Sequence, residues 1–387
     1  MLIDLQLFLF LLLICLLLYW AVPASQPRLR AVIVVAVSTI AVNLASPIVA
    51  VLCLVSTGLA RLAGATFRRR QSSAALTVLV GAQIALILLP DVVGLLKLRE
   101  SPLVYVGLAF FGLKSIAATV DCFKYQKEIA FLDLLLLNIF FPIFSAGPVE
   151  QPDTFAVRSL AAPFNLGDQA AGMGRMLLGI FKHFYLAREI VDGYVAATFP
   201  ADAADLAQLD PGSAYVYAAL HWLSLFLSFS GYTDIAVGAG RLFGVRIREN
   251  FNMPYLARSI QEYWQRWHMS LMGFMSKYVY MSFVRRTGWR VAGIFVVFLC
   301  AGFWHALSPN YLFWALAHGS ALAGFTLFQR SNLARSWHRV VSLNRPVAVA
   351  HDVFSRVVTL SFVFIVSAVG TAPSWEFGAA LLWALVP

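Results

Sequence analysis

The sequence has little charge. Only 12% of its 387 residues are Asp, Glu, Lys or Arg, whereas 60% are hydrophobic. Soluble domains carry about 25% charged residues, so the composition excludes a soluble protein and predicts one surrounded by membrane lipid. The formal net charge is +10, but the basic residues lie in short clusters between apolar runs. A nucleic-acid-binding protein would present them as a stripe or tail, so we expect no nucleic-acid partner.

Patterns for metals, disulfides and soluble enzyme chemistry are also missing. The four cysteines are widely spaced and form no CxxC pair, which predicts neither a metal site nor a disulfide framework. No GxSxG, HExxH, Walker or GxGxxG motif occurs in a supporting context, which disfavours serine hydrolases, zinc proteases and nucleotide-binding proteins. No internal repeat is visible, whereas many secondary transporters are built from inverted repeats.

The sequence does contain a series of apolar runs. They predict an all-α integral membrane protein, because lipid offers no hydrogen-bond partner to open strand edges. We expect one polytopic domain over residues 1–387, with N-terminal helices in 1–128, a core in 129–328 and C-terminal helices in 329–387. The expected segments are Leu5–Trp20, Ala31–Ala45, Ile48–Ala63, Ala74–Leu89, Pro102–Val120, Ile129–Phe144, Ala170–Phe199, Ala214–Phe229, Arg290–His305, Tyr311–Phe328, Phe354–Gly370 and Glu376–Leu385.

The first segments permit a topology prediction. Leu5–Trp20 lacks a basic region before it and follows Asp4, so we expect a retained helix rather than a signal peptide. Pro47 divides the next apolar stretch, and basic residues flank that stretch on both sides, at 28–30 and at 61–70. Positive flanks favour the cytoplasm. We therefore expect a helical hairpin with its tip near Pro47 and an N-terminus that faces outward.

A polar, aromatic stretch follows at residues 259–271. Ser259 and Glu262 have the spacing of a capping box and predict the start of a helix. Continued as one helix, it would place Tyr263, Trp267 and Ser270 on one face, and Trp264, His268 and Leu271 on the neighbouring face. Two interpretations are open. The segment is either an interfacial helix with an aromatic belt and a snorkelling Arg266, or a helix that points His268 into a polar cavity.

Further ionisable residues lie inside apolar segments. His305 ends one such segment, His318 lies within the next, and Asp234 lies in a third region. Ionisable groups at membrane depth are costly and functional by default, although each can also form a hydrogen bond between helices. Asp234 could equally be a structural partner of an Arg or a Tyr. A histidine in an apolar cavity stays neutral and suits general-base catalysis on an alcohol, which would suit acyl transfer from an activated thioester.

Several motifs in a fixed order carry a family resemblance. The main ones are Asn250–Tyr255, Tyr263–Leu271, Gly302–His305 and Trp314–Gly319, with support from Phe140–Val149, Gly179–Lys182 and Ser230–Ile235. This sequence resembles the membrane-bound O-acyltransferase (MBOAT) family in its bacterial polymer-modifying branch. The resemblance implies a ring of tilted helices around a central funnel, with amphipathic helices at the membrane interface.

The resemblance also implies residue roles. His305 would be the catalytic general base, and His268 would position the donor or polarise its carbonyl. The residues expected to support the site or line the tunnel are His318, Trp304, Trp267, Asp234 and Asn252.

The implied donor is a pantetheine thioester, on an acyl carrier protein or coenzyme A, that enters from the cytoplasm without any permanently bound cofactor. The implied acceptor is a hydroxyl of an envelope polymer, or an intermediary acyl-accepting protein, outside the bacterial cytoplasmic membrane. The motif forms are closer to the teichoic acid D-alanyltransferase type than to the alginate O-acetyltransferase type. We expect the basic cluster Arg285, Arg286 and Arg290 to dock an acidic carrier protein from the cytoplasm. A transporter for a polymer or its lipid-linked precursor, and a partner-dependent scaffold, are the alternatives from other classes.

Overall fold

The computed structural model describes residues 4–95, 107–144 and 146–386. All regular secondary structure in these residues is helical, which confirms the all-α class. The chain divides into two compact units, residues 1–180 with 231–249, and residues 181–230 with 250–387. Each unit is described by itself.

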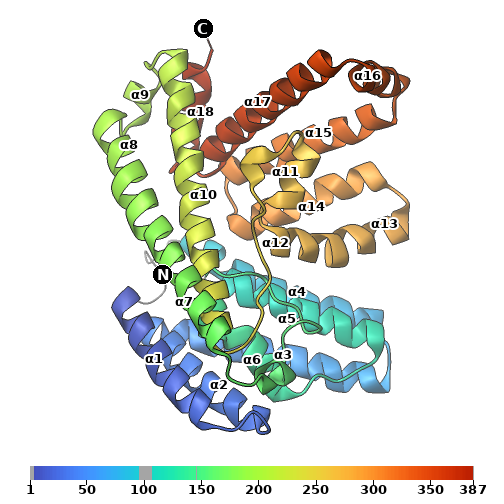
Figure 1. The fold of residues 1–387 in the computed structure, drawn as a ribbon. Helices are drawn as coiled ribbons and strands as arrows, with labels where there is room; N and C mark the ends of the chain where they lie inside the picture. The colour runs from blue at the N-terminus through green and yellow to red at the C-terminus, as the bar shows by residue number, and fades with distance from the viewer. Residues whose placement is uncertain (1–3, 96–106, 145, 387) are drawn as a thin grey trace. The chain divides into compact units, whose positions relative to one another are not determined.

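The first unit contains the N-terminal helices. In Figure 1, α3, α4 and α5 lie side by side within it, as the backbone contacts between them also show. Its elements are α1 (Leu5–Ala21), α2 (Pro27–Ala45), α3 (Pro47–Arg69), α4 (Ser73–Leu95), α5 (Leu108–Tyr125), α6 (Phe131–Ile139), η2 (Phe141–Ile143), η3 (Val157–Ala161), α7 (Leu166–Ile180) and the C-terminal part of α10 (Pro211–Leu242).

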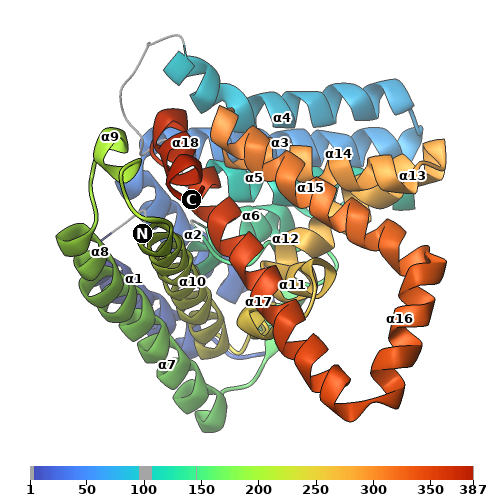
Figure 2. The same cartoon turned by 90° about the horizontal axis from the view of Figure 1, so that it is seen from above.

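The second unit contains the remaining elements. Its helices α14 and α15 pack along each other, and α17 packs on α15, as Figures 1 and 2 show. Besides the first part of α10, the elements are η4 (Phe181–Asp192), α8 (Gly193–Thr198), α9 (Ala203–Leu206), η5 (Pro254–Leu256), α11 (Ile260–Arg266), α12 (Met269–Phe274), η6 (Met275–Tyr280), α13 (Met281–Thr287), α14 (Arg290–His305), α15 (Pro309–Arg330), α16 (Asn332–Leu343), α17 (Arg345–Gly370) and α18 (Trp375–Ala384).

Most predicted segments coincide with helices, and α14 has the predicted bounds Arg290–His305 at both ends. Within the part of the chain that the structure describes, four helices are long and apolar enough to span a membrane, namely α2, α3, α15 and α17. α2 ends at Ala45 and α3 begins at Pro47, so the predicted break at this proline is confirmed. The first five residues of the predicted segment Pro102–Val120 lie outside the described residues.

Some segment predictions were wrong in length. Phe354–Gly370 was predicted too short, because α17 begins at Arg345. The segment Ile129–Phe144 was predicted too long, because α6 ends at Ile139 and only the short turn η2 follows. The segment Ala214–Phe229 was predicted too short, because α10 continues to Leu242. Glycines explain this continuation: a Cβ on Gly238 would come within 2.6 Å of the backbone oxygen of Gly172. The backbones of α7 and α10 therefore approach closely there, and the glycines, with Asp234 and Arg241, lower the hydropathy of this part of α10.

In the first unit, the α1–α2 turn is held by a buried arginine. Arg30 is 2% exposed and stacks on Tyr19 at 4.6 Å. Its guanidinium donates hydrogen bonds to the carbonyl oxygens of Val22, Leu160 and Ala162. The hydroxyl of Tyr19 donates to the carbonyl oxygens of Leu160 and Phe243. Carbonyls without a helix partner are thereby satisfied away from water.

In the second unit, two side-chain contacts join η4 to α10. The Nδ1 of His183 lies 2.8 Å from the hydroxyl of Ser228, and the hydroxyl of Ser224 donates to the carboxylate of Asp192. η4 is wound as a π-helix along its whole length, whereas such winding occurs mostly as single turns. The two contacts fix η4 and this part of α10 in register.

Candidate active site

One pocket of the second unit collects four of the predicted site residues, Trp267 and three histidines. It has a volume of about 170 Å³ and lies among α10, α11, α14, α15 and α17. His268, His305 and His318 line it together with aromatic side chains, and none of the described residues that line it carries a carboxylate. The complete set is Leu225, Phe229, Tyr263, Trp264, Trp267, His268, His305, Tyr311, Trp314, His318, Ser367 and Thr371.

The backbone at His268 departs from the predicted single helix. α11 ends at Arg266 and α12 begins at Met269, and His268 between them is left-handed, with φ +44°. The prediction was wrong because residues 250–252 take up the backbone bonds of this turn. The N–H of Asn252 donates to the oxygen of Arg266, and the N–H of Met269 donates to the oxygen of Asn250, both at 2.9 Å. Trp264 of α11 and the two residues of the break, Trp267 and His268, all line the pocket.

The start of α11 agrees more closely with the prediction. The hydroxyl of Ser259 accepts a hydrogen bond from the N–H of Glu262 at 3.1 Å. The Glu262 carboxylate accepts from the N–H of Arg258, one residue before the expected partner. Burial raises the pKa of Glu262, but the hydrogen bonds from Arg258 and Arg266 outweigh burial and hold this pKa below its usual range.

Asn250 determines how His268 presents its ring. The side-chain oxygen of Asn250 accepts a hydrogen bond from the Ser270 hydroxyl at 2.6 Å and lies 3.3 Å from the Nδ1 of His268. The backbone N–H of Ser270, which can only donate, also points to this atom at 3.4 Å. The atom is therefore assigned as the amide oxygen, and the Nδ1 of His268 must donate to it. The neutral ring therefore carries no proton on Nε2, which is buried without a hydrogen-bond partner.

The aromatic surroundings hold these rings in place. Trp267 stacks on Tyr263 at 5.6 Å and meets Phe251 edge-on at 5.0 Å. The indole N–H of Trp222 donates to the hydroxyl of Tyr263. Phe229 meets the His268 ring edge-on at 4.7 Å. Such edge-on and offset pairs are the favoured aromatic geometries, so the pocket wall is rigid.

The other two histidines differ in accessibility. His305 is exposed and stacks on Tyr311 at 5.0 Å. His318 is 1% exposed, and its ring centroid lies 4.9 Å from the ring centroids of both Trp264 and Trp314. Within the described residues, no group of three or more His, Cys, Asp or Glu side chains is placed to hold a metal ion.

Two further buried polar atoms lining the pocket lack a partner. They are the Nδ1 of His318 and the indole N–H of Trp264. A buried polar group without a hydrogen bond costs about 1–3 kcal/mol, so such groups at a pocket are available to a ligand. The indole nitrogen can only donate, and the lone pair of His268 can only accept. Together with the Nδ1 of His318, whose role depends on its tautomer, the unpartnered lining atoms thus include one donor and one acceptor of fixed polarity.

The remaining predicted residues lie elsewhere. Asp234 belongs to the first unit, where its carboxylate accepts a hydrogen bond from the Nε of Arg175 at 2.8 Å. This contact agrees with the second interpretation of Asp234, a structural partner of an arginine. Asn252 is exposed and contributes backbone bonds rather than a pocket wall. Trp304 lies against the rings of His268 and His305 without lining the pocket.

The sequence interpretation missed Asn250 and Trp264 as site residues, although both fall within the quoted motifs. No local pattern reveals a hydrogen bond between residues 18 positions apart, or which indole N–H will lack a partner. The three arginines Arg285, Arg286 and Arg290 lie around the α13–α14 turn and are exposed.

Comparison with known proteins identifies the family. The family model described as "MBOAT, membrane-bound O-acyltransferase family" matches residues 126–345, more than half of the chain. The probable alginate O-acetylase AlgI of Pseudomonas syringae pv. tomato is 30% identical over 231 residues, 56% of this chain and 42% of that protein. The teichoic acid D-alanyltransferase of Bacillus subtilis is 27% identical over 249 residues, 60% of this chain and 62% of that protein. The peptidoglycan O-acetyltransferase of Helicobacter pylori is 31% identical over 270 residues, 60% of this chain and 49% of that protein.

The chain spans about half the length of the curated relatives that it matches. The matched region of the family model contains all the residues that line the pocket except Ser367 and Thr371. Over the whole chain, the described residues include four helices that are long and apolar enough to cross a membrane. The chain is therefore a multi-pass, all-helical membrane protein that belongs to the membrane-bound O-acyltransferase family.

Proposed function

We propose that this protein moves a small acyl group from a pantetheine thioester to a hydroxyl group of a bacterial envelope polymer. The observation that carries the proposal is the meeting of His268, His305 and His318 in one aromatic pocket. Relatives that modify alginate, teichoic acid and peptidoglycan support the class of acceptor.

His305 is proposed as the general base, because it is the only exposed residue of the three histidines that line the pocket, so an acceptor hydroxyl can approach it. The base takes the hydroxyl proton while the oxygen forms a bond to the thioester carbonyl carbon. The carbon–sulfur bond then breaks, and the leaving thiolate takes the proton from the imidazolium. Such a base contributes about 10²–10⁴-fold to the rate.

The fixed donor, the Trp264 N–H, and the fixed acceptor, the Nε2 of His268, suggest different roles for these two residues. The Trp264 N–H is proposed to donate to the oxygen that becomes negative at the attacked carbonyl. His268 cannot polarise that carbonyl while its Nε2 lacks a proton, so we assign it the other predicted role, positioning the donor. Its lone pair would accept a hydrogen bond from an amide N–H of the pantetheine arm. His318 supports Trp264 by ring contact.

The size of the pocket limits the acyl group. About 170 Å³ is below the roughly 300–1,000 Å³ of pockets for drug-sized ligands, so a long acyl chain does not fit within it. Acetyl is the first candidate, because burying an ammonium without a carboxylate is costly. D-alanyl, which the sequence motifs favour, is the second candidate, because the aromatic faces of Trp264 and Trp314 can attract its ammonium.

Carrier docking and location complete the proposal. The exposed cluster Arg285, Arg286 and Arg290 would attract an acidic acyl carrier protein by long-range electrostatics, with coenzyme A as the alternative donor. This places the α13–α14 turn at the cytoplasmic face of the bacterial inner membrane. The acceptor would be the polymer itself or an intermediary acyl-accepting protein outside.

Mass spectrometry of envelope polymers tests the function. Cells that lack the gene are complemented with the wild type, with His305→Ala, or with His351→Ala as a matched histidine outside the pocket. We expect polymer-bound ester groups with the wild type and His351→Ala, and their loss with His305→Ala. Near-normal esters with a stably inserted His305→Ala variant would refute the proposal, and the mass of the group distinguishes acetyl from D-alanyl.

A further inference from the structure

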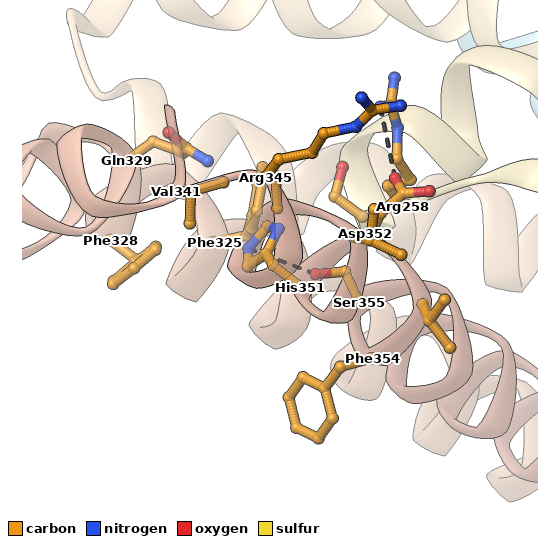
Figure 3. Close-up of a pocket in the computed structure, with 14 residues that line it drawn as sticks. Arg258, Phe325, Phe328, Gln329, Val341, Arg345, His351, Asp352, Phe354 and Ser355 are labelled. Atoms are coloured by element: carbon orange, nitrogen blue, oxygen red, sulfur yellow. Dashed lines mark hydrogen bonds and ion pairs between the residues drawn. The ribbon is translucent and has the colours of Figure 1, made fainter. Parts of the chain in front are cut away.

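A second and larger pocket lies outside the histidine pocket of the same unit. It has a volume of about 800 Å³ and is formed by the C-terminal end of α15, the first turns of α17, Val341 of α16 and the residues before α11. Figure 3 shows charged side chains, Arg258, Arg345 and Asp352, on one side and Phe328 and Phe354 on the other. The pocket is amphiphilic.

The charged side carries excess positive charge. Asp352 lies 3.3 Å from Arg258 and 3.1 Å from Arg356. Glu262, the other carboxylate of the cluster, pairs with Arg258 and Arg266. Arg345 is exposed and has no hydrogen-bond or ion-pair partner among the residues that the structure describes. Within the pocket lining, Arg258 and Arg345 therefore face one carboxylate, Asp352, and the guanidinium of Arg345 is available to an anion.

The apolar side continues into a slot between α15 and α17. A cavity of about 430 Å³ shares Arg258, Phe325, Phe328 and Phe354 with the first pocket and extends to Phe362. The slot follows α17 for eight residues from Phe354 to Phe362, about 12 Å at 1.5 Å per residue. Its walls bear no charged side chain beyond Arg258, so a hydrocarbon chain is the ligand that suits it.

The position of the pocket matches the phosphate level of a bilayer. α15 ends at Arg330 and α17 begins at Arg345, and both helices are candidate membrane spans. The sequence from Arg330 to Arg345 contains four arginines and no acidic residue. Basic clusters directly beside a span attract anionic lipids of the cytoplasmic leaflet. The side chains of Val349, Val353 and Phe354 are more than half exposed, as expected next to lipid.

We propose that this pocket binds one anionic phospholipid. Its phosphate would lie on the guanidiniums of Arg345 and Arg258, and one acyl chain would occupy the slot between α15 and α17. Arginine suits this role because its planar fork presents paired donors to phosphate oxygens.

Native mass spectrometry of the full-length protein tests the site. Protein from nanodiscs that contain equal amounts of phosphatidylglycerol and phosphatidylcholine is released, and the retained lipid is counted. We compare the wild type with Arg345→Gln, with Val349→Trp, which fills the pocket without a change of charge, and with Arg69→Gln as a charge-matched control on an exposed arginine of α3. Monodisperse elution in detergent shows that each variant is folded.

The expected result is one retained phosphatidylglycerol in the wild type and in Arg69→Gln. Arg345→Gln should weaken retention about fivefold, the effect of one basic residue at a lipid surface, and Val349→Trp should weaken it at least as much. Unchanged retention of phosphatidylglycerol in either pocket variant overturns the proposal, because the lipid would then be held by diffuse attraction to the basic surface rather than by this pocket. Displacement of the lipid by an equal concentration of soluble phosphopantetheine also overturns it, because the pocket would then belong to the acyl donor.

Discussion

Replacement of Asn250 by Ala should disable the site while leaving the chain folded. The substitution removes an oxygen, buried at 0% exposure, that accepts from Ser270 and from His268. Each lost hydrogen bond costs about 1 kcal/mol net, and a buried group left without a partner costs about 1–3 kcal/mol. We expect the free energy of unfolding to fall by about 2–4 kcal/mol. The backbone bonds of residues 250 and 252 remain, so the segment stays attached.

The effect on turnover should be larger than the effect on stability implies. The left-handed backbone of His268 costs about 1–3 kcal/mol, which the bonds to Asn250 offset, so their loss lets the ring move. A displacement of about 1 Å can cost about 100-fold in rate, and we expect a fall of that order in kcat. Purified protein in nanodiscs, assayed for acyl transfer and for thermal unfolding by tryptophan fluorescence, measures both quantities.

Two further variants separate positioning from general stability. Ser270→Ala removes the competing hydroxyl but keeps the acceptor for His268, so kcat should stay within about threefold although about 1 kcal/mol of stability is lost. Asn250→Asp keeps the acceptor but adds a charge that favours the imidazolium. The acid limb of the kcat profile should therefore move to higher pH. Wild-type kcat in a folded Asn250→Ala variant, or equal kcat losses in Asn250→Ala and Ser270→Ala, would refute this reasoning.

Three other predictions concern single groups. Trp264→Phe keeps an aromatic ring but removes the N–H. We expect kcat to fall about 10²–10³-fold, as for other lost oxyanion donors, with little change in KM. Trp314→Phe, in the same pocket wall, is the control, and an equal loss of kcat there would contradict the role of the Trp264 N–H. Gly238→Ala places a Cβ 2.6 Å from the backbone oxygen of Gly172 and should lower the melting temperature. Gly174→Ala is the control, because a Cβ there meets no atom within 4 Å. Equal melting temperatures of the two variants would contradict the close approach of α7 and α10. The pKa of Glu262 is held below its usual range. Its ionised form therefore stabilises the fold at pH values above the unfolded-state pKa, and this contribution is lost as the pH falls through the lowered pKa. Glu262→Gln should flatten the acid side of a plot of unfolding free energy against pH, and an unchanged slope would contradict a stabilising role of its ion pairs.

Local sequence features explain why most helices were predicted. A lipid environment requires long apolar helices, so runs such as Arg290–His305 mark both helix ends directly. Pro47 likewise marks a break, since proline is favoured in a first helical turn and restricts the residue before it. The C-terminal part of α10 escaped prediction because its contacts with α7 depend on glycines that pair across 66 residues, Gly172 and Gly238.

The site was predictable in its residue types but not in its geometry. His268, His305 and Trp267 stood out as polar or aromatic residues in motifs, and all three line the pocket. The tautomer of His268 depends on Asn250, and the availability of the Trp264 N–H depends on what surrounds it. Both properties depend on contacts between residues far apart in the sequence, which the periodicity of a single helix cannot predict.

The π winding of η4 has a consequence for the length of this segment. His183 and Asp192 are nine residues apart, which at about 100° per residue would place them on opposite sides of an α-helix. At about 82° per residue in a π-helix the same nine residues complete two turns, so both side chains face Ser228 and Ser224, which are four residues apart on α10. Deletion of one residue between them would rotate Asp192 by roughly 80° away from its serine. The number of residues in this segment, more than their identity, is therefore what the fold constrains, and substitutions should be tolerated where insertions and deletions are not.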